Sequence, residues 1–159
     1  MSEELLSAGR TLGVIGAGVM GTALLKGMLD HGLLSRRQAW GAAKTEASCE
    51  EVAQSLGITT SREYGDLVGD AEIVLIAVKP GQAGKVAEKL KASGLRKDAL
   101  LISVLAGVTT ERFEGLLGSE NPFVRAMPNT PCLVGHGGRP FTEKIFFTAA
   151  ESSAFAASP

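Results

Sequence analysis

Residues 11–21 decide the fold, and they read Thr-Leu-Gly-Val-Ile-Gly-Ala-Gly-Val-Met-Gly. The short apolar run 12–15, which includes β-branched residues, predicts a buried strand. Three glycines follow this run at the spacing G-x-G-x-x-G. Apolar residues then recur at helical spacing as far as Met28, which predicts a helix that stops at Gly32.

Each glycine of the motif has its own physical reason. Gly16 lets the chain turn sharply out of the strand, Gly18 leaves the backbone open to a pyrophosphate, and Gly21 lets the helix lie close to the strand. The backbone N–H groups of Val19, Met20 and Gly21 then face the ligand at the positive end of the helix. A strand before the motif and a helix after it are the context that a dinucleotide site requires. The alternative is a glycine-rich turn that binds nothing.

Composition is typical of one globular domain, or of one domain with an appendage, because the chain has 159 residues of which 45% are apolar. A formal net charge of −1 gives no electrostatic reason to expect nucleic acid or an acidic membrane as partner. No apolar run approaches the roughly 18 residues of a membrane-spanning helix, and the acidic start does not resemble a signal peptide.

Two isolated cysteines, Cys49 and Cys132, suit a reducing compartment better than a disulfide scaffold, so we expect a cytoplasmic protein. The two histidines, His31 and His136, lack metal-ligand spacing with either cysteine, and no metal site is predicted. Cys132 has no activating base beside it in the sequence. His136 is either a solvated loop histidine or a general acid.

Strand and helix patterns alternate along the rest of the chain. Strands are predicted at 38–43, 58–60, 72–78, 99–104 and 122–127, and helices at 46–56, 62–68, 82–92 and from a cap at Thr109 or Thr110 to Leu117. This order predicts an α/β fold, a doubly wound parallel sheet of the Rossmann-like, NAD(P)-binding kind with a short atypical C-terminal tail. Trp40, in the second strand, is expected to pack against a neighbour rather than stack on a ligand.

The end of the second strand bears on the choice of cofactor. An NAD site usually has an acidic residue there for the ribose 2′-hydroxyl, whereas an NADP site offers a cation or a hydroxyl to the 2′-phosphate. Lys44 and Thr45 favour NADP, while Glu46, read as the first turn of a helix capped by Thr45, weakens that preference. NAD remains possible, and Lys44 is alternatively only a surface charge.

Ligands of open α/β sheets bind outside the carboxyl ends of the strands. The turn 79–81 is therefore a candidate lining of the crevice, or only a rigid turn. Ser103 and Gly107 either admit the backbone near a nicotinamide or serve packing. Asn129, between two prolines, either offers its amide to a ligand or holds its turn.

Four motifs give the chain a resemblance to one family. They are 16–27 (GAGVMGTALLKG), 77–81 (AVKPG), 103–108 (SVLAGV) and 125–131 (RAMPNTP). In this order they resemble the N-terminal domain of pyrroline-5-carboxylate reductase, and the resemblance extends over roughly residues 11–137.

The resemblance implies the reduction of 1-pyrroline-5-carboxylate, a small-molecule substrate, to L-proline with NADPH or NADH. It implies that the segment from Gly16 to Gly21 holds the cofactor pyrophosphate. It further implies that Lys44 and Thr45 lie near the 2′-phosphate, that Val78, Lys79 and Pro80 line the nicotinamide ribose, and that Ala106, Gly107 and Asn129 lie around the nicotinamide.

The family pattern stops near Gly137, so the expected domain organisation is a polar lead-in at 1–10, the binding domain at 11–137 and a non-family tail at 138–159. Reductases of this family continue into a helical domain that forms homo-oligomers and supplies the catalytic hydroxyl. We therefore expect a truncated or frame-shifted sequence that binds NADP(H) but turns over little. Alternatives are a non-catalytic NADP(H)-binding or partner-binding module, and a small reductase of the 3-hydroxyacid dehydrogenase type.

Overall fold

One twisted sheet with helices on both faces forms the part of the chain that the computed structural model describes, which is Leu6 and residues 9–105, 107–118, 121–127 and 148–152. The strands are β1 (Thr11–Ile15), β2 (Ala39–Ala42), β3 (Thr59–Ser61), β4 (Ala71–Ile76), β5 (Leu100–Ser103), β6 (Phe123–Met127) and β7 (Thr148–Ser152). The helices are α1 (Val19–Asp30), α2 (Glu46–Leu56), α3 (Ala83–Ala92) and α4 (Thr110–Leu117).

The strand order is β3-β2-β1-β4-β5-β6-β7. Strands β1 to β6 pair in parallel, which confirms the doubly wound parallel sheet. The order reverses between β1 and β4, and this switch point is where such sheets form a ligand crevice. Strand β7 pairs antiparallel with the edge strand β6, and it comes from a segment for which the sequence predicted no element.

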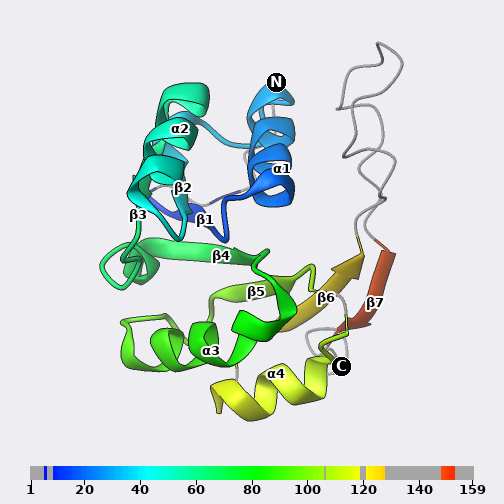
Figure 1. Ribbon diagram of the computed structural model, residues 1–159. Helices are drawn as coiled ribbons and strands as arrows, with labels where there is room; N and C mark the ends of the chain where they lie inside the picture. Colours follow the sequence, from blue (N-terminus) through cyan, green and yellow to red (C-terminus); the bar gives the residue numbers. More distant parts are fainter. Residues whose placement is uncertain (1–5, 7–8, 106, 119–120, 128–147, 153–159) are drawn as a thin grey trace.

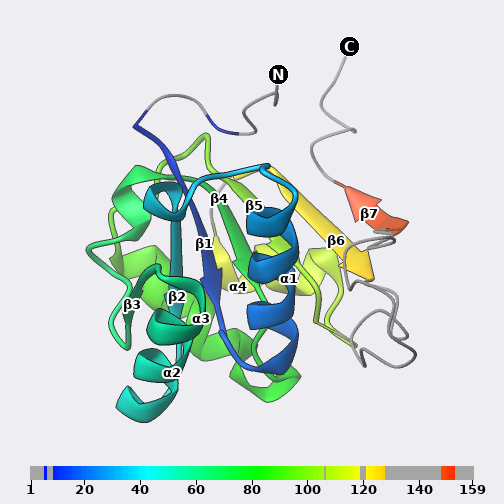
Figure 2. The same ribbon diagram turned by 90° about the horizontal axis from the view of Figure 1, so that it is seen from above.

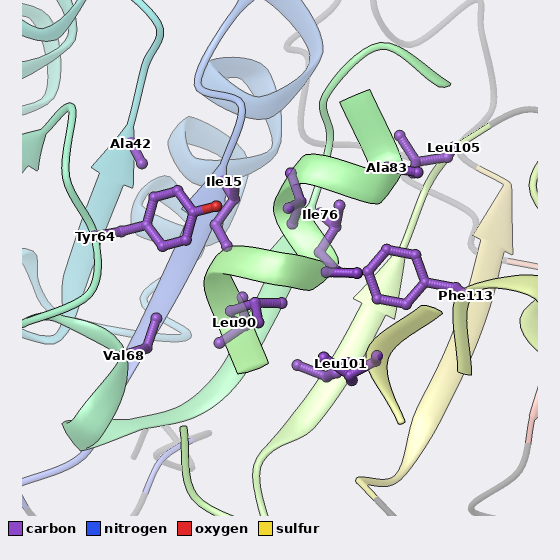
Figure 3. Close-up of a cluster of buried hydrophobic side chains, with 14 of the residues drawn as sticks. Ile15, Ala42, Tyr64, Val68, Ile76, Ala83, Leu90, Leu101, Leu105 and Phe113 are labelled. Atoms are coloured by element: carbon purple, nitrogen blue, oxygen red, sulfur yellow. The ribbon is translucent and has the colours of Figure 1, made fainter. Parts of the chain in front are cut away.

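Helices α1 and α2 cover one face of the sheet, and α3 and α4 cover the other (Figures 1 and 2). The first face buries Leu24, Leu25 and Val52 against Leu12 and Val14 of β1. The second face is built around α3 and the stacked rings of Phe113 and Phe123, whose centroids lie 5.1 Å apart; Figure 3 shows part of this cluster. Among the described residues, no helix is both long enough and apolar enough to cross a bilayer.

Helix ends follow the residues that sequence reasoning expected. The hydroxyl of Thr45 accepts a backbone N–H from the first turn of α2 at 3.1 Å, and Gly57 ends that helix at φ +68°. For α4, Thr109 rather than Thr110 is the cap, with its hydroxyl accepting a backbone N–H at 3.1 Å, and Gly118 ends the helix at φ +64°. These contacts satisfy helix-end groups that would otherwise lack partners.

The helix predicted over 62–68 is wrong. The Ser61 hydroxyl instead accepts the backbone N–H of Glu63 at 3.0 Å and donates to its carbonyl at 2.7 Å, which favours a turn over a helix. Turns follow as far as a short 3₁₀ helix at Val68–Asp70. Tyr64, in this turn, is buried on the α3 face of the sheet. A second difference is smaller: the helix predicted over 82–92 begins as a 3₁₀ turn at Pro80–Gln82 and becomes α-helical at Ala83.

Trp40 packs against a neighbouring strand, as expected. Its side chain is 2% exposed, and its indole N–H donates to the hydroxyl of Thr11 at 3.2 Å. Trp40 is in register with Gly13 on β1, and a Cβ at Gly13 would overlap the indole ring. Gly13 therefore provides the space for the indole of Trp40, which is among the largest fully buried side chains of the described residues.

The Gly13→Ala substitution should destabilise the protein by about 2–4 kcal/mol, because the added methyl must displace the Trp40 indole from a packed site. Urea unfolding followed by far-UV circular dichroism measures this loss. In a Trp40→Leu background, which removes the indole, the same substitution should cost less than about 1 kcal/mol. An equal cost in both backgrounds would show that the overlap with Trp40 is not the cause.

Candidate functional site

The loop after β1 is fixed by its own backbone. Gly16 has φ +95°, in the region that favours glycine, and the N–H groups of Gly16 and Ala17 both donate to the carbonyl of Ala42 at the end of β2, at 2.9 Å. A Cβ at Gly16 would lie 2.7 Å from the backbone of Ala77 and of Val78 in the loop after β4. Gly16 therefore allows the ends of β1, β2 and β4 to meet.

The other two glycines of the motif have different surroundings. A Cβ at Gly21 would collide with the carbonyl oxygen of Gly16, so Gly21 brings α1 against the loop. A Cβ at Gly18 would meet no atom within 4 Å. Packing within the protein therefore does not explain Gly18, and the space beside it is open.

The amino-terminal end of α1 borders this space. The first backbone bond of the helix runs from Thr22 N–H to the Gly18 carbonyl at 3.0 Å, so the three preceding N–H groups have no acceptor within the helix. Gly18, the N-cap, has no side chain to satisfy them, and the first turn contains no acidic residue. Val19 is 83% exposed. These features suit an anion at the positive end of the helix.

A cleft of about 380 Å³ opens between this loop, the ends of β2 and β4, and helix α3. Its described lining includes five cationic side chains and no carboxylate, and the residues are Ile15, Gly16, Ala17, Gly18, Ala42, Ala43, Lys44, Ser48, Arg62, Tyr64, Ala77, Val78, Lys79, Gln82, Lys85, Val86 and Lys89. A cleft with this lining favours a ligand that carries several negative charges. Within the described part of the chain, no group of three or more metal-binding side chains comes together.

Five of the predicted site residues line this cleft, namely Gly16, Gly18, Lys44, Val78 and Lys79. Others are outside the lining: Val19, Met20 and Gly21 begin α1, Pro80 begins the 3₁₀ turn before α3, and Gly107 precedes α4 with φ +75°. Ala106 and Asn129, like Cys132 and His136, fall outside the described residues.

Two predicted polar residues have their hydroxyls engaged by the protein itself. Thr45 is also outside the lining, and its hydroxyl both accepts the backbone N–H of Ser48 at 3.1 Å and donates to the Ser48 hydroxyl at 2.9 Å. The Ser103 side chain is buried, and its hydroxyl accepts the backbone N–H of Leu105 at 3.2 Å. Each hydroxyl therefore has a structural role in the loop that follows its strand.

Sequence reasoning missed Arg62, Tyr64, Lys85 and Lys89. Arg62 directly follows β3, so the rule that sites lie at strand ends could have found it. Lys85 and Lys89 are four residues apart on α3 and therefore lie on one face of that helix, which is also a readable signal. Nothing in the sequence marks Tyr64, because its place depends on the turn that replaces the predicted helix.

Local contacts hold these side chains at the cleft. The Arg62 Nε donates to the carbonyl of Lys44 at 3.2 Å, which ties the ends of β2 and β3 together. The Lys89 Nζ lies 5.2 Å from the centre of the Tyr64 ring and 3.4 Å from a Glu63 carboxylate oxygen. Burial, and secondarily the Glu63 charge, raises the pKa of Tyr64 to about 12. The phenol therefore keeps its proton at neutral pH.

Comparisons with known proteins agree with this geometry. Residues 11–107 match the family described as NADP oxidoreductase coenzyme F420-dependent. The chain is 33% identical over 144 residues to the pyrroline-5-carboxylate reductase of Escherichia coli (strain K12), which covers 91% of this chain and 53% of that protein. The chain thus spans about half the length of the curated relatives it matches.

Solved structures give the same result. A pyrroline-5-carboxylate reductase from Coxiella burnetii superimposes with a TM-score of 0.70 at 31% identity, covering 77% of this chain and 45% of that one. The Plasmodium falciparum pyrroline carboxylate reductase with NADP bound superimposes with a TM-score of 0.61 at 32% identity, covering 79% and 45%. From the glycine loop, the cleft and these matches together, we conclude that the chain belongs to the NADP oxidoreductase coenzyme F420-dependent family.

Proposed function

We propose that this chain is the cofactor-binding part of a reductase that forms L-proline from 1-pyrroline-5-carboxylate with NADPH or NADH. The observation that carries the proposal is the open space at Gly18, which faces the free end of α1 and which nothing in the protein's own packing requires. The relatives named pyrroline-5-carboxylate reductase, and the NADP bound to one of them, support the choice of reaction and cofactor.

The residues present fit a dinucleotide. The backbone from Gly16 to Gly21 would hold the pyrophosphate at the start of α1, since the N–H groups there have no helical acceptor. Lys44 would lie at the adenosine end, and Val78 and Lys79 would lie toward the nicotinamide ribose, with Pro80 and Gly107 in the adjoining turns. When bound, the cofactor supplies the hydride for the carbon of the C=N bond.

The protein's part in this chemistry is to place the cofactor. Orienting the nicotinamide in a fixed position lowers the barrier by making hydride transfer effectively unimolecular. We assign no catalytic acid. Residues 11–137 would form the binding unit, with 1–10 and 138–159 outside it, and the full-length enzyme would be a cytoplasmic homo-oligomer.

NADPH should raise the melting temperature of the chain, because a ligand that binds only the folded state stabilises it. At a concentration about 100 times the dissociation constant, the gain is about 2.7 kcal/mol, or roughly 5–10 °C for a chain of this size. Differential scanning fluorimetry with NADPH, together with isothermal titration calorimetry, measures the effect. No shift and no binding heat would contradict a dinucleotide site.

Gly18→Ser should weaken NADPH binding at least about tenfold without lowering stability. The serine Cβ fills the open space, and the hydroxyl can cap the N–H groups that the pyrophosphate needs. Calorimetry gives the affinity, and urea unfolding gives the stability.

Gly115→Ala is the matched control, since Gly115 is exposed on α4, away from the cleft, and also has open space around it. It should leave the affinity unchanged. Unaltered NADPH binding by Gly18→Ser would remove the main support for the proposed function.

A further inference from the structure

Tyr64 is a nearly buried polar side chain whose hydroxyl has no protein partner among the described residues. The residue is 5% exposed, and it nevertheless lines the cleft. Figure 3 shows its hydroxyl directed toward Ile15 at the end of β1, with Ala42 of β2 nearby. The Tyr64 hydroxyl is not one of the buried polar atoms that lack a partner in the described part of the chain. Because Tyr64 lines the cleft, a molecule that enters the cleft can accept a hydrogen bond from this hydroxyl.

The phenol has the chemistry of a hydrogen-bond donor. Burial and the Glu63 charge hold its pKa at about 12, so the proton stays on the oxygen throughout the physiological range. A neutral donor at the floor of a cleft with no carboxylate in its described lining suits an anionic acceptor such as a phosphate oxygen.

Cationic side chains from two different elements line the cleft together with Tyr64. Arg62 comes from the end of β3, and its Nε donates to the Lys44 carbonyl, while its terminal nitrogens have no hydrogen bond to the described residues. Lys89 comes from α3 and lies over the Tyr64 ring. A planar guanidinium, an ammonium and a phenol together match a phosphate monoester, which offers three acceptor oxygens.

The position along the cleft identifies which phosphate this would be. The pyrophosphate belongs at the start of α1, whereas Arg62 follows β3, two strands away from β1 in the sheet, and donates to the Lys44 carbonyl beyond β2. Tyr64 comes from the same turn as Arg62, and its hydroxyl is directed from there toward the end of β1 (Figure 3). The adenosine end of a dinucleotide lies toward β2 and beyond it. Of the ligand groups at that end, only a 2′-phosphate carries charge.

We propose that Tyr64, Arg62 and Lys89 form the subsite for the adenosine 2′-phosphate and make this cleft selective for NADP(H) over NAD(H). This assignment rests on the proposed function. It adds two elements, the turn after β3 and helix α3, to the Lys44 and Thr45 pair that the sequence indicated.

The test compares NADPH with NADH on the full 159-residue chain by isothermal titration calorimetry. Adenosine 2′,5′-bisphosphate and adenosine 5′-monophosphate serve as a second pair that differs only in the 2′-phosphate. Unmodified protein should bind NADPH at least about tenfold more tightly than NADH. Tyr64→Phe and Arg62→Gln should each weaken the binding of NADPH and of the bisphosphate about tenfold, as expected for loss of a hydrogen bond to a charged group. The affinities for NADH and for the monophosphate should change less than about twofold.

Lys97→Gln is the matched control for charge. Lys97 is exposed and precedes β5, so it lies at the amino-terminal ends of the strands, whereas the cleft lies at their carboxyl ends. This substitution should leave the NADPH to NADH ratio unchanged, and Lys89→Gln should lower it. Melting temperatures without ligand check folding, and Tyr64→Phe should not lower them, since it removes a hydroxyl that has no hydrogen-bond partner among the described residues.

The outcomes separate the subsite from the proposed function. Equal affinity of the unmodified chain for NADPH and NADH would overturn the subsite while leaving a dinucleotide site intact. If Tyr64→Phe lowers the affinities for NADPH and NADH equally, the hydroxyl contacts another part of the nucleotide, and the 2′-phosphate subsite is also overturned. Failure of both dinucleotides to bind would overturn the subsite and the proposed function together.

Discussion

The direct backbone contact between the loops after β1 and β4 is the constraint on which the site depends. Gly16 lies against the backbone of Ala77, and Gly21 lies against the carbonyl of Gly16, with no side chain between them. Any Cβ at these two positions would force the loops apart and move the start of α1. Gly18 lies between these two packed positions in the sequence and has open space around it.

The electrostatics of the cleft differ from those of the whole chain. The formal net charge is only −1, yet cations from the ends of β2, β3 and β4 and from α3 meet around one opening. They meet because parallel strands end at the same edge of the sheet. The connection between β3 and β4 contains no α-helix, and this turn is what places Tyr64 under the opening.

The described lining of the cleft contains groups suited to binding an anion but none suited to proton transfer near neutral pH. The described lining of the cleft contains no carboxylate and no histidine, and its tyrosine, with a pKa of about 12, is too weak an acid to protonate a substrate near neutral pH. What the described residues offer is a helix end with free N–H groups, an open space at Gly18 and a rim of cationic side chains.

The sequence by itself determined the parallel, doubly wound sheet, the glycine loop, the cap at Thr45 and the position of Lys44 and Lys79 at strand ends, because these depend on local periodicity and on the rule that parallel strands end on the same side of the sheet. It narrowed the cap of α4 to Thr109 or Thr110, and the structure decided for Thr109. Tertiary structure decided the burial of Tyr64 in the turn at 62–68, and this burial, added to the local hydrogen bond between Ser61 and Glu63, outweighed helical propensity. It also decided the pairing of β7, since antiparallel pairing at an open edge leaves no pattern in a strand this short. The difference is physical: local hydrogen bonds and periodicity are encoded by neighbours in the chain, whereas burial depends on which distant elements arrive.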